Sequence, residues 1–126
     1  MTGETILIVE DEGLIALHLT ELLEKAGYRV EDPVFSGEMA LQTLERSQKP
    51  DLILMDIGLA GQLDGIETAR QILQRSSVPL IFITAYTSER MLERMREVAP
   101  CGVVIKPFDD NDLLDRIRKT MACRSP

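Results

Sequence analysis

Residues 49–58 read KPDLILMDIG, and the unbroken apolar run LILM sets this stretch apart from the rest of the chain. Such a run, followed directly by a polar residue and a glycine, is typical of a parallel strand that is covered on both faces. We therefore predict a central buried strand over residues 51–55. That strand delivers Asp56 at its carboxyl end.

Outward from this stretch, strand patterns and helix patterns alternate along the whole chain. Short runs rich in β-branched residues are each followed by apolar residues at helical spacing. The predicted strands cover residues 5–9, 28–34, 51–55, 78–84 and 102–105, and Pro33 is expected to interrupt the second strand near its end. The predicted helices begin at residue 13, after the capping residues Ser36, Asp64 and Ser88, and at residue 109, the last helix reaching residue 121.

This alternation implies a parallel sheet with helices on both faces and right-handed crossovers. Five βα units account for nearly every residue, so we predict an α/β fold with a doubly wound five-stranded parallel sheet in the order 2-1-3-4-5. Residues 1–126 are expected to form one domain, because this length suits a single core and no linker interrupts the pattern.

Composition argues against several classes of function. The chain carries 14 Lys and Arg against 21 Asp and Glu, a formal net charge of -7 at pH 7, which opposes direct binding to nucleic acid or to anionic membranes. No apolar run approaches the length of a membrane span and the first residues lack a secretory pattern, so we expect a cytoplasmic protein. Cys101 and Cys123 lack metal-ligand spacing and are expected to be reduced thiols.

Polar side chains gather where the predicted strands end. In a doubly wound sheet this edge holds the functional site, at the point where the winding changes direction. The residues delivered there are Glu10, Asp11, Asp56, Thr84, Ala85 and Lys106. Two carboxylates about 4 Å apart repel by roughly 4 kcal/mol at an effective dielectric near 20, so three of them demand a cation or a raised pKa. Magnesium, or manganese or calcium in its place, suits these oxygen donors and implies phosphoryl-transfer chemistry.

The motifs at these strand ends carry a family resemblance. VEDE stands at residues 9–12, LMD at 54–56, TA at 84–85 and KPF at 106–108. Each motif alone is weak, but the four together, in order and at the ends of the correct strands, are highly specific. Over essentially its whole length the chain resembles the receiver domains of two-component response regulators, which have a flavodoxin-like fold.

The resemblance implies a role for each of these residues. Asp56 would accept a phosphoryl group from a sensor histidine kinase, a phosphotransfer protein or a small phosphodonor. Glu10, Asp11, Asp56 and the backbone carbonyl of Gly58 would hold the metal ion. Such a domain is a signalling phosphoacceptor rather than an enzyme, since its only chemistry is its own phosphorylation and dephosphorylation.

The remaining motif residues would bind the phosphoryl group or shape its surroundings. Lys106 and the Thr84 hydroxyl would contact phosphoryl oxygens, with the Ala85 amide nearby, and a cis bond is expected before Pro107. The signal would pass to a downstream protein or a fused output domain, or to a second copy in a homodimer. The surface expected for this is the fourth helix, the last strand and the last helix, with the candidates Met91, Met95, Val103 and Arg118.

Two features depart from the usual receiver pattern, and two further positions bear on the lifetime of the phosphoryl group. Many receivers carry Tyr or Phe three residues before the lysine as a rotameric switch, where this chain has Val103. The loop from Gly58 to Gly65 lacks the usual Met-Pro pair and is slightly long. Gly58 and Tyr86 occupy the two variable positions that flank the path of a hydrolytic water, and we expect the Tyr86 ring to shield the phosphate and prolong its lifetime.

Three other functions fit parts of the pattern. An aspartate-based phosphohydrolase usually needs a second acid two residues after its nucleophile, and Gly58 stands there. A flavin module needs hydroxyls and amides in its first loop, whereas the acidic residues 10–12 would repel phosphate. A receiver-like module that only binds proteins would not need the intact acidic set. His18 is interpreted as structural, and Met91 and Met95 as either core or interface residues.

Overall fold

The computed structural model of the chain describes residues 3–46, 49–58, 64–85 and 88–123, in which strands and helices alternate throughout. The strands are β1 (Thr5–Val9), β2 (Arg29–Val30), β3 (Leu52–Asp56), β4 (Leu80–Thr84) and β5 (Gly102–Ile105). The helices are α1 (Gly13–Lys25), α2 (Gly37–Arg46), α3 (Gly65–Arg75), α4 (Glu89–Val98) and α5 (Asp110–Cys123).

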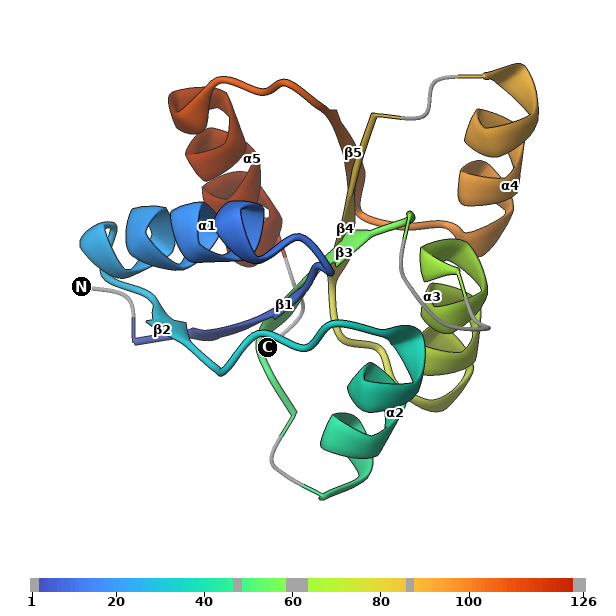
Figure 1. Cartoon of the computed structure of the whole chain (residues 1–126), viewed down its shortest axis with the longest axis horizontal. Helices are drawn as coiled ribbons and strands as arrows, with labels where there is room; N and C mark the ends of the chain where they lie inside the picture. Colours follow the sequence, from blue (N-terminus) through green and yellow to red (C-terminus); the bar gives the residue numbers. More distant parts are fainter. Residues whose placement is uncertain (1–2, 47–48, 59–63, 86–87, 124–126) are drawn as a thin grey trace.

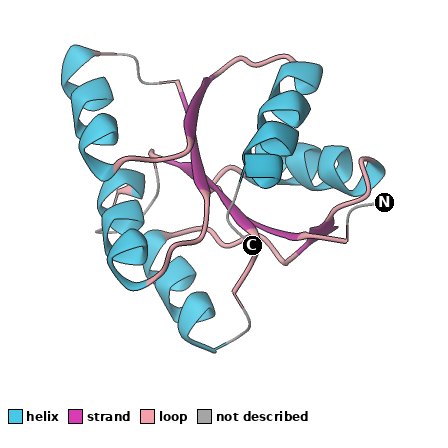
Figure 2. Ribbon diagram, turned by 180° about the vertical axis from the view of Figure 1, so that it is seen from behind, coloured by secondary structure: helices cyan, strands magenta, loops and turns pink. Residues whose placement is uncertain are grey.

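The strands form one parallel sheet in the order β2-β1-β3-β4-β5, which confirms the predicted fold. Figure 1 shows α1 and α5 on one side of this sheet and α2, α3 and α4 on the other. Seen from behind, the helices again flank the strands on both sides (Figure 2). The middle strand β3 lies between β1 and β4, and its residues are all buried, as expected for a strand covered on both faces.

The core consists of two apolar layers because successive strand residues point to opposite faces of the sheet. Met55 and Phe82 belong to the layer beneath α2, α3 and α4, and both are fully buried. Leu54 and Ile83 belong to the layer beneath α1 and α5 and are equally buried. Each such side chain contributes about 1.5–3 kcal/mol by leaving water. This double core fixes the strands rigidly and so fixes the side chains at their ends.

The three predicted helix caps are all present. Ser36 Oγ, Asp64 Oδ1 and Ser88 Oγ each accept a hydrogen bond from the backbone amide three residues later, at 3.1, 2.8 and 3.3 Å. Asp109 also caps α5, because its Oδ1 accepts from the amides of Asn111 at 2.7 Å and Asp112 at 3.4 Å. Among the described helices, none has the length and apolar character to cross a lipid bilayer.

The second strand differs most from its prediction. It was expected over residues 28–34, but regular pairing with β1 covers only Arg29 and Val30. Pro33 has no amide hydrogen to donate to the sheet, and beyond it Val34 forms one isolated bridge to Val9. In β4 the same effect places the first strand residue at Leu80, directly after a proline, instead of at residue 78. The prediction of strand ends was therefore wrong where proline interrupts pairing.

Candidate functional site

The site is built from the carboxyl ends of β1 and β3, which are neighbours in the sheet. Val9 pairs with Met55, so the residues that follow them, Glu10 and Asp56, emerge side by side. Glu10 is 1% exposed and Asp56 6%. One carboxylate oxygen from each of Glu10, Asp11 and Asp56 lies within 4.8 Å of the others. The predicted acidic cluster is thus present at the topological switch point between β1 and β3.

Lys106 lies at the end of β5 and reaches across to this cluster. Its Nζ donates to Glu10 Oε1 at 3.2 Å and to Asp56 Oδ1 at 3.5 Å. Its backbone amide donates to the Thr84 carbonyl at 2.8 Å, which ties the lysine to the end of β4. Burial lowers the lysine pKa, but Asp56 and Glu10 outweigh this effect and raise it above the ordinary value. Lys106 therefore stays charged and bridges two carboxylates.

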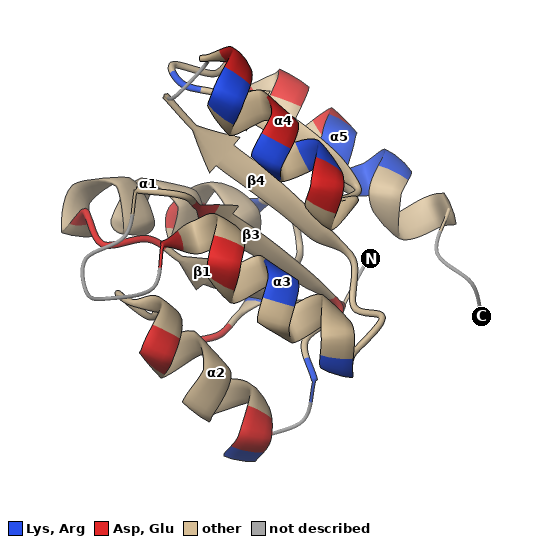
Figure 3. Ribbon diagram, turned by 90° about the vertical axis from the view of Figure 1, so that its right-hand side faces the viewer, with Lys and Arg blue, Asp and Glu red and all other residues tan. Residues whose placement is uncertain are grey.

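Even with this ammonium group nearby, Glu10 does not ionise easily. Burial, followed by the charge of Asp56, raises the pKa of Glu10 to about 7, although the Glu12 amide and Lys106 act in the opposite direction. The Glu12 amide donates to Glu10 Oε2 at 3.2 Å. In Figure 3 the loop between β1 and α1 shows as a stretch of acidic residues. The site thus holds more negative charge than Lys106 neutralises, as the sequence predicted.

The remaining predicted residues lie at the same edge of the sheet. Thr84 is the last residue of β4 and is fully buried, and Ala85 follows it and is exposed. Ile83 pairs with Asp56, so Thr84 lies one residue beyond the level of the acceptor on the neighbouring strand. Gly58 is exposed, two residues after Asp56. The structure therefore brings the whole predicted set to one edge, while the metal contact assigned to the Gly58 carbonyl stays a prediction.

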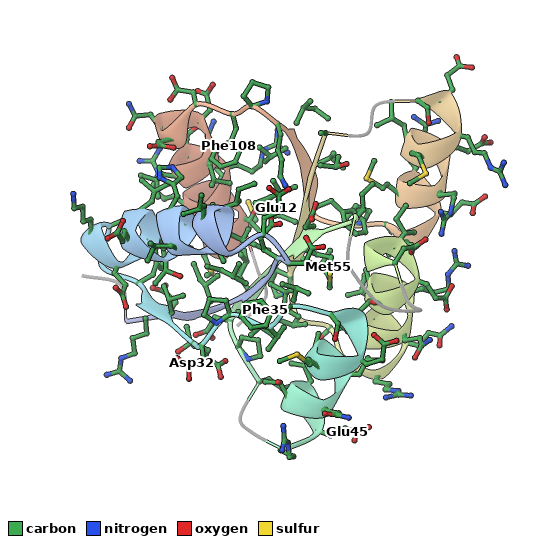
Figure 4. The ribbon with its side chains drawn as sticks, viewed as in Figure 1. Glu12, Asp32, Phe35, Glu45, Met55 and Phe108 are labelled. Carbon is green, nitrogen blue, oxygen red and sulfur yellow. The ribbon has the colours of Figure 1, made fainter. Side chains whose placement is uncertain are left out.

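The residues after Lys106 connect the site to α1. The peptide bond between Lys106 and Pro107 is cis, as predicted. Phe108 lies between α1 and α5 (Figure 4), with its ring centroid 6.5 Å from that of His18. His18 Nε2 lies 3.0 Å from Asp110 Oδ1. His18 therefore joins α1 to the start of α5, which agrees with its structural interpretation and gives it no place in the acidic cluster.

The residues predicted for the signalling surface around α4 differ in how deeply they are buried. Met95 is fully buried in the core, so its prediction as a signalling-surface residue was wrong. Of the two roles considered for it, core or interface, the structure supports the core. Met91 and Val103 are partly buried and pack against the same layer, whereas Arg118 is exposed. Tyr86, expected to cover the phosphate, and most of the loop from Gly58 to Gly65 lie outside the described residues.

Sequence reasoning missed one contact near the site. Arg94 on α4 donates from Nη2 to Asp64 Oδ2 at 2.9 Å, although the two residues stand 30 positions apart. Asp64 was recognised only as the cap of α3. No local pattern announces such a pair, because it depends on how α3 and α4 pack together.

A cavity lies at the opposite end of the sheet from the acidic cluster. It has a volume of about 1140 Å³ and is lined by residues before β3, β4 and β5 and by the end of α5. Cys101 and Cys123 both line it as exposed free thiols, in agreement with the expectation of unpaired cysteines. None of the predicted site residues contributes to it.

Comparison with known proteins identifies the family to which this fold belongs. A family model of the response regulator receiver domain matches residues 6–118. The chain is 34% identical over 112 residues to the transcriptional regulatory protein PdtaR of Mycobacterium tuberculosis, covering 89% of this chain and 54% of that protein. It is 31% identical over 128 aligned positions to sporulation initiation phosphotransferase F of Bacillus subtilis, covering 99% of each.

A solved structure gives the same result. The receiver domain of a sensor histidine kinase from Pseudomonas aeruginosa, described with a magnesium ion coordinated in its active site cleft, superposes with a TM-score of 0.85. It is 31% identical, and the match covers 96% of this chain and 99% of that one. The chain therefore belongs to the response regulator receiver family. It spans about half the length of PdtaR.

Proposed function

We propose that this receiver domain accepts a phosphoryl group on Asp56 from a sensor histidine kinase, a phosphotransfer protein or a small phosphodonor. The observation that carries the proposal is the arrangement around Asp56, where Lys106 Nζ bridges Asp56 and Glu10 beside Asp11. A buried carboxylate with a lysine and two further acids around it suits a nucleophile that must receive a highly charged group.

The proposed phosphoryl transfer to Asp56 forms one bond to phosphorus and breaks another. A carboxylate oxygen of Asp56 attacks the phosphorus of a phosphohistidine, a new oxygen–phosphorus bond forms, and the phosphorus–nitrogen bond breaks. The electron pair of that bond stays on the imidazole nitrogen, which can then take a proton. Lys106 Nζ lies 3.5 Å from Asp56 Oδ1, and it would contact a phosphoryl oxygen and offset its negative charge. The Thr84 hydroxyl and the Ala85 amide would bind another phosphoryl oxygen.

The donor set also fits a magnesium ion, or manganese or calcium in its place. Three carboxylates whose oxygens converge within 4.8 Å are hard oxygen ligands, and Mg²⁺ commonly combines one or two carboxylates with phosphate oxygens. Glu10, Asp11 and Asp56 would hold the ion, with the Gly58 carbonyl as a further ligand. When bound, it would offset negative charge on the phosphoryl oxygens. The magnesium described for the receiver domain from Pseudomonas aeruginosa supports this assignment.

The same arrangement favours a signalling switch over an enzyme. Chemistry would be limited to forming and hydrolysing the phosphoryl group on Asp56, because Gly58 offers no acid or base at the position where phosphohydrolases carry one. We expect the domain to work in the cytoplasm and to act on a downstream protein, a fused output domain or a second copy through α4, β5 and α5. Similarity to regulators about twice as long supports a fused output domain as one of these arrangements.

The test is incubation with acetyl phosphate or phosphoramidate and magnesium, followed by intact mass measurement. One phosphoryl group should be added to the wild-type protein and none to Asp56→Asn. Asp32→Asn, an exposed residue in the loop after β2, is the matched control and should be labelled normally. Full labelling of Asp56→Asn would refute the assignment of the acceptor.

A further inference from the structure

The ion pair between α4 and the start of α3 is built more firmly than a surface pair. Arg94 Nη2 donates to Asp64 Oδ2 at 2.9 Å, and Arg94 Nη1 donates to Met91 Sδ at 3.8 Å. The two charged side chains are 33% and 39% exposed. Burial opposes ionisation of Asp64, but the Glu67 amide and Arg94 together hold the pKa of this carboxyl below its usual range. The Arg94 guanidinium is therefore held at two atoms, Nη2 by Asp64 and Nη1 by Met91.

Gly65, the residue after Asp64, lies directly against the backbone of the acceptor. Its amide donates to the Ile57 carbonyl at 3.1 Å. A Cβ atom on Gly65 would lie only 2.1 Å from the Asp56 carbonyl oxygen and 2.5 Å from Ile57 Cα. There is no free space between the two backbone segments, so the backbone at residues 56–57 cannot shift without moving Asp64 and Gly65.

The other end of the pair belongs to a weakly anchored helix. Met95 is the one fully buried residue in α4, with Met91, Leu92 and Val98 only partly buried against the same core layer, whereas α3 has five fully buried residues. Arg and Glu residues occupy the outer face of α4, where Figure 3 shows basic and acidic segments interspersed, and this face is exposed to water. A helix with little buried apolar surface has alternative positions close in free energy, and one charged contact can then decide which of them is populated.

Position 103 does not supply the aromatic side chain that many receivers use as a rotameric switch. Val103 is partly buried and packs against the layer beneath α4, and it carries no aromatic ring that could change its rotamer. We propose that the Arg94–Asp64 pair couples the phosphorylation state of Asp56 to the position of α4. A backbone shift at residues 56–57 displaces Asp64 through Gly65, and Arg94 carries this displacement to α4. The inference rests on the proposed function, because it needs a phosphoryl group on Asp56.

The test measures amide hydrogen exchange in residues 89–98 with and without phosphorylation by a small phosphodonor. Arg94→Gln removes the guanidinium, and Asp64→Asn removes the charge while leaving a side chain that can still cap α3. In both variants α4 should exchange faster before phosphorylation than in the wild type. The change in exchange caused by phosphorylation should fall to less than about half of the wild-type change, because the two states of α4 no longer differ in this contact.

Four controls separate this role from a merely structural one. Thermal melts confirm that each variant is folded, and intact mass confirms equal phosphoryl occupancy. Arg96→Gln, an exposed arginine on the same helix, should keep the full response. Arg94→Lys, which retains a cation, should restore most of it. An undiminished response in either Arg94→Gln or Asp64→Asn, or an equal loss in Arg96→Gln, would overturn the inference. A wild-type protein that takes no phosphoryl group would instead refute the proposed function, and the mass measurement shows this first.

Discussion

Glu10 is a fully buried acid that shares one ammonium group with a second buried acid, Asp56. Its pKa of about 7 means that near neutral pH a proton competes with any cation for its carboxylate. Because the folded-state pKa lies above the ordinary value of 4.5, the contribution of Glu10 to the stability of the metal-free protein is present below pH 4.5. That contribution is lost as the pH rises through about 7.

Magnesium binding should therefore depend on pH. We expect binding to be about tenfold weaker at pH 6 than at pH 8, because a proton with a pKa of about 7 must leave Glu10 before its carboxylate can hold the ion. Calorimetric titration at several pH values measures this. Glu10→Gln should bind magnesium more weakly and lose the dependence. A wild-type affinity that stays constant across this range would show that Glu10 is not a ligand.

Tyr86 is the residue expected to set the lifetime of the phosphoryl group. It lies outside the described residues, so this prediction depends on the sequence alone. Tyr86→Ala should accelerate loss of the label after donor removal several-fold, which corresponds to about 1 kcal/mol in the barrier, because water reaches phosphorus more easily. Tyr86→Phe keeps the ring and should behave like the wild type. Equal lifetimes in the alanine variant and the wild type would refute shielding by Tyr86.

At the scale of elements, the start of α3 is the part packed most tightly against the acceptor. Gly65→Ala would place a methyl group against the backbone of Asp56 and Ile57, which can move only together with the start of α3. We expect it to lower the free energy of unfolding by about 3 kcal/mol, as overpacking does in a dense core. Urea unfolding measures the loss.

A second glycine supplies the comparison. In Gly102→Ala the new methyl group would meet the Arg116 side chain, with Nη1 at 2.5 Å as the nearest atom. A flexible side chain can swing away, so we expect a cost below about 1 kcal/mol. Equal losses in the two variants would contradict the distinction between backbone and side-chain obstruction.

The elements also show what a sequence can and cannot predict. The caps Ser36, Asp64 and Ser88 were predictable because capping is local chemistry, and Asp56 and Lys106 because parallel strands bring their ends to one edge. The interruption of β2 at Pro33 was predictable, but the strand was still drawn too long, because apolar content does not reveal where regular pairing stops. Helical spacing left Met95 between core and surface, and the Arg94–Asp64 pair follows only from tertiary packing.

At the scale of the whole molecule, the site is linked more directly to the β5 edge of the sheet than to the β2 edge. Lys106 follows β5, and Thr84 ends β4 beside it, so both lead toward α4 and α5. The strand β2, which α2 follows along the chain, lies at the opposite edge of the sheet.

Phosphorylation should therefore affect the two edges unequally. We expect amide exchange in α4, β5 and α5 to change more than in α2, because Thr84 and Lys106 must reorient toward the phosphoryl oxygens while α2 carries none of the predicted site residues. Hydrogen exchange with mass spectrometry across the chain measures both regions in one experiment. Asp56→Asn treated with the same donor is the control. Equal changes in α2 and in α4, β5 and α5 would contradict this direction of signalling.

The central claim is that Asp56 itself carries the phosphoryl group. Borohydride reduces an acyl phosphate to an alcohol, so reduction after phosphorylation converts the modified aspartate into homoserine, which peptide sequencing by mass spectrometry can locate. The account predicts homoserine at position 56 only, in the presence of donor and magnesium, and none when the donor is omitted. Homoserine at position 11, at position 51 or at another aspartate, with position 56 unchanged, would contradict it.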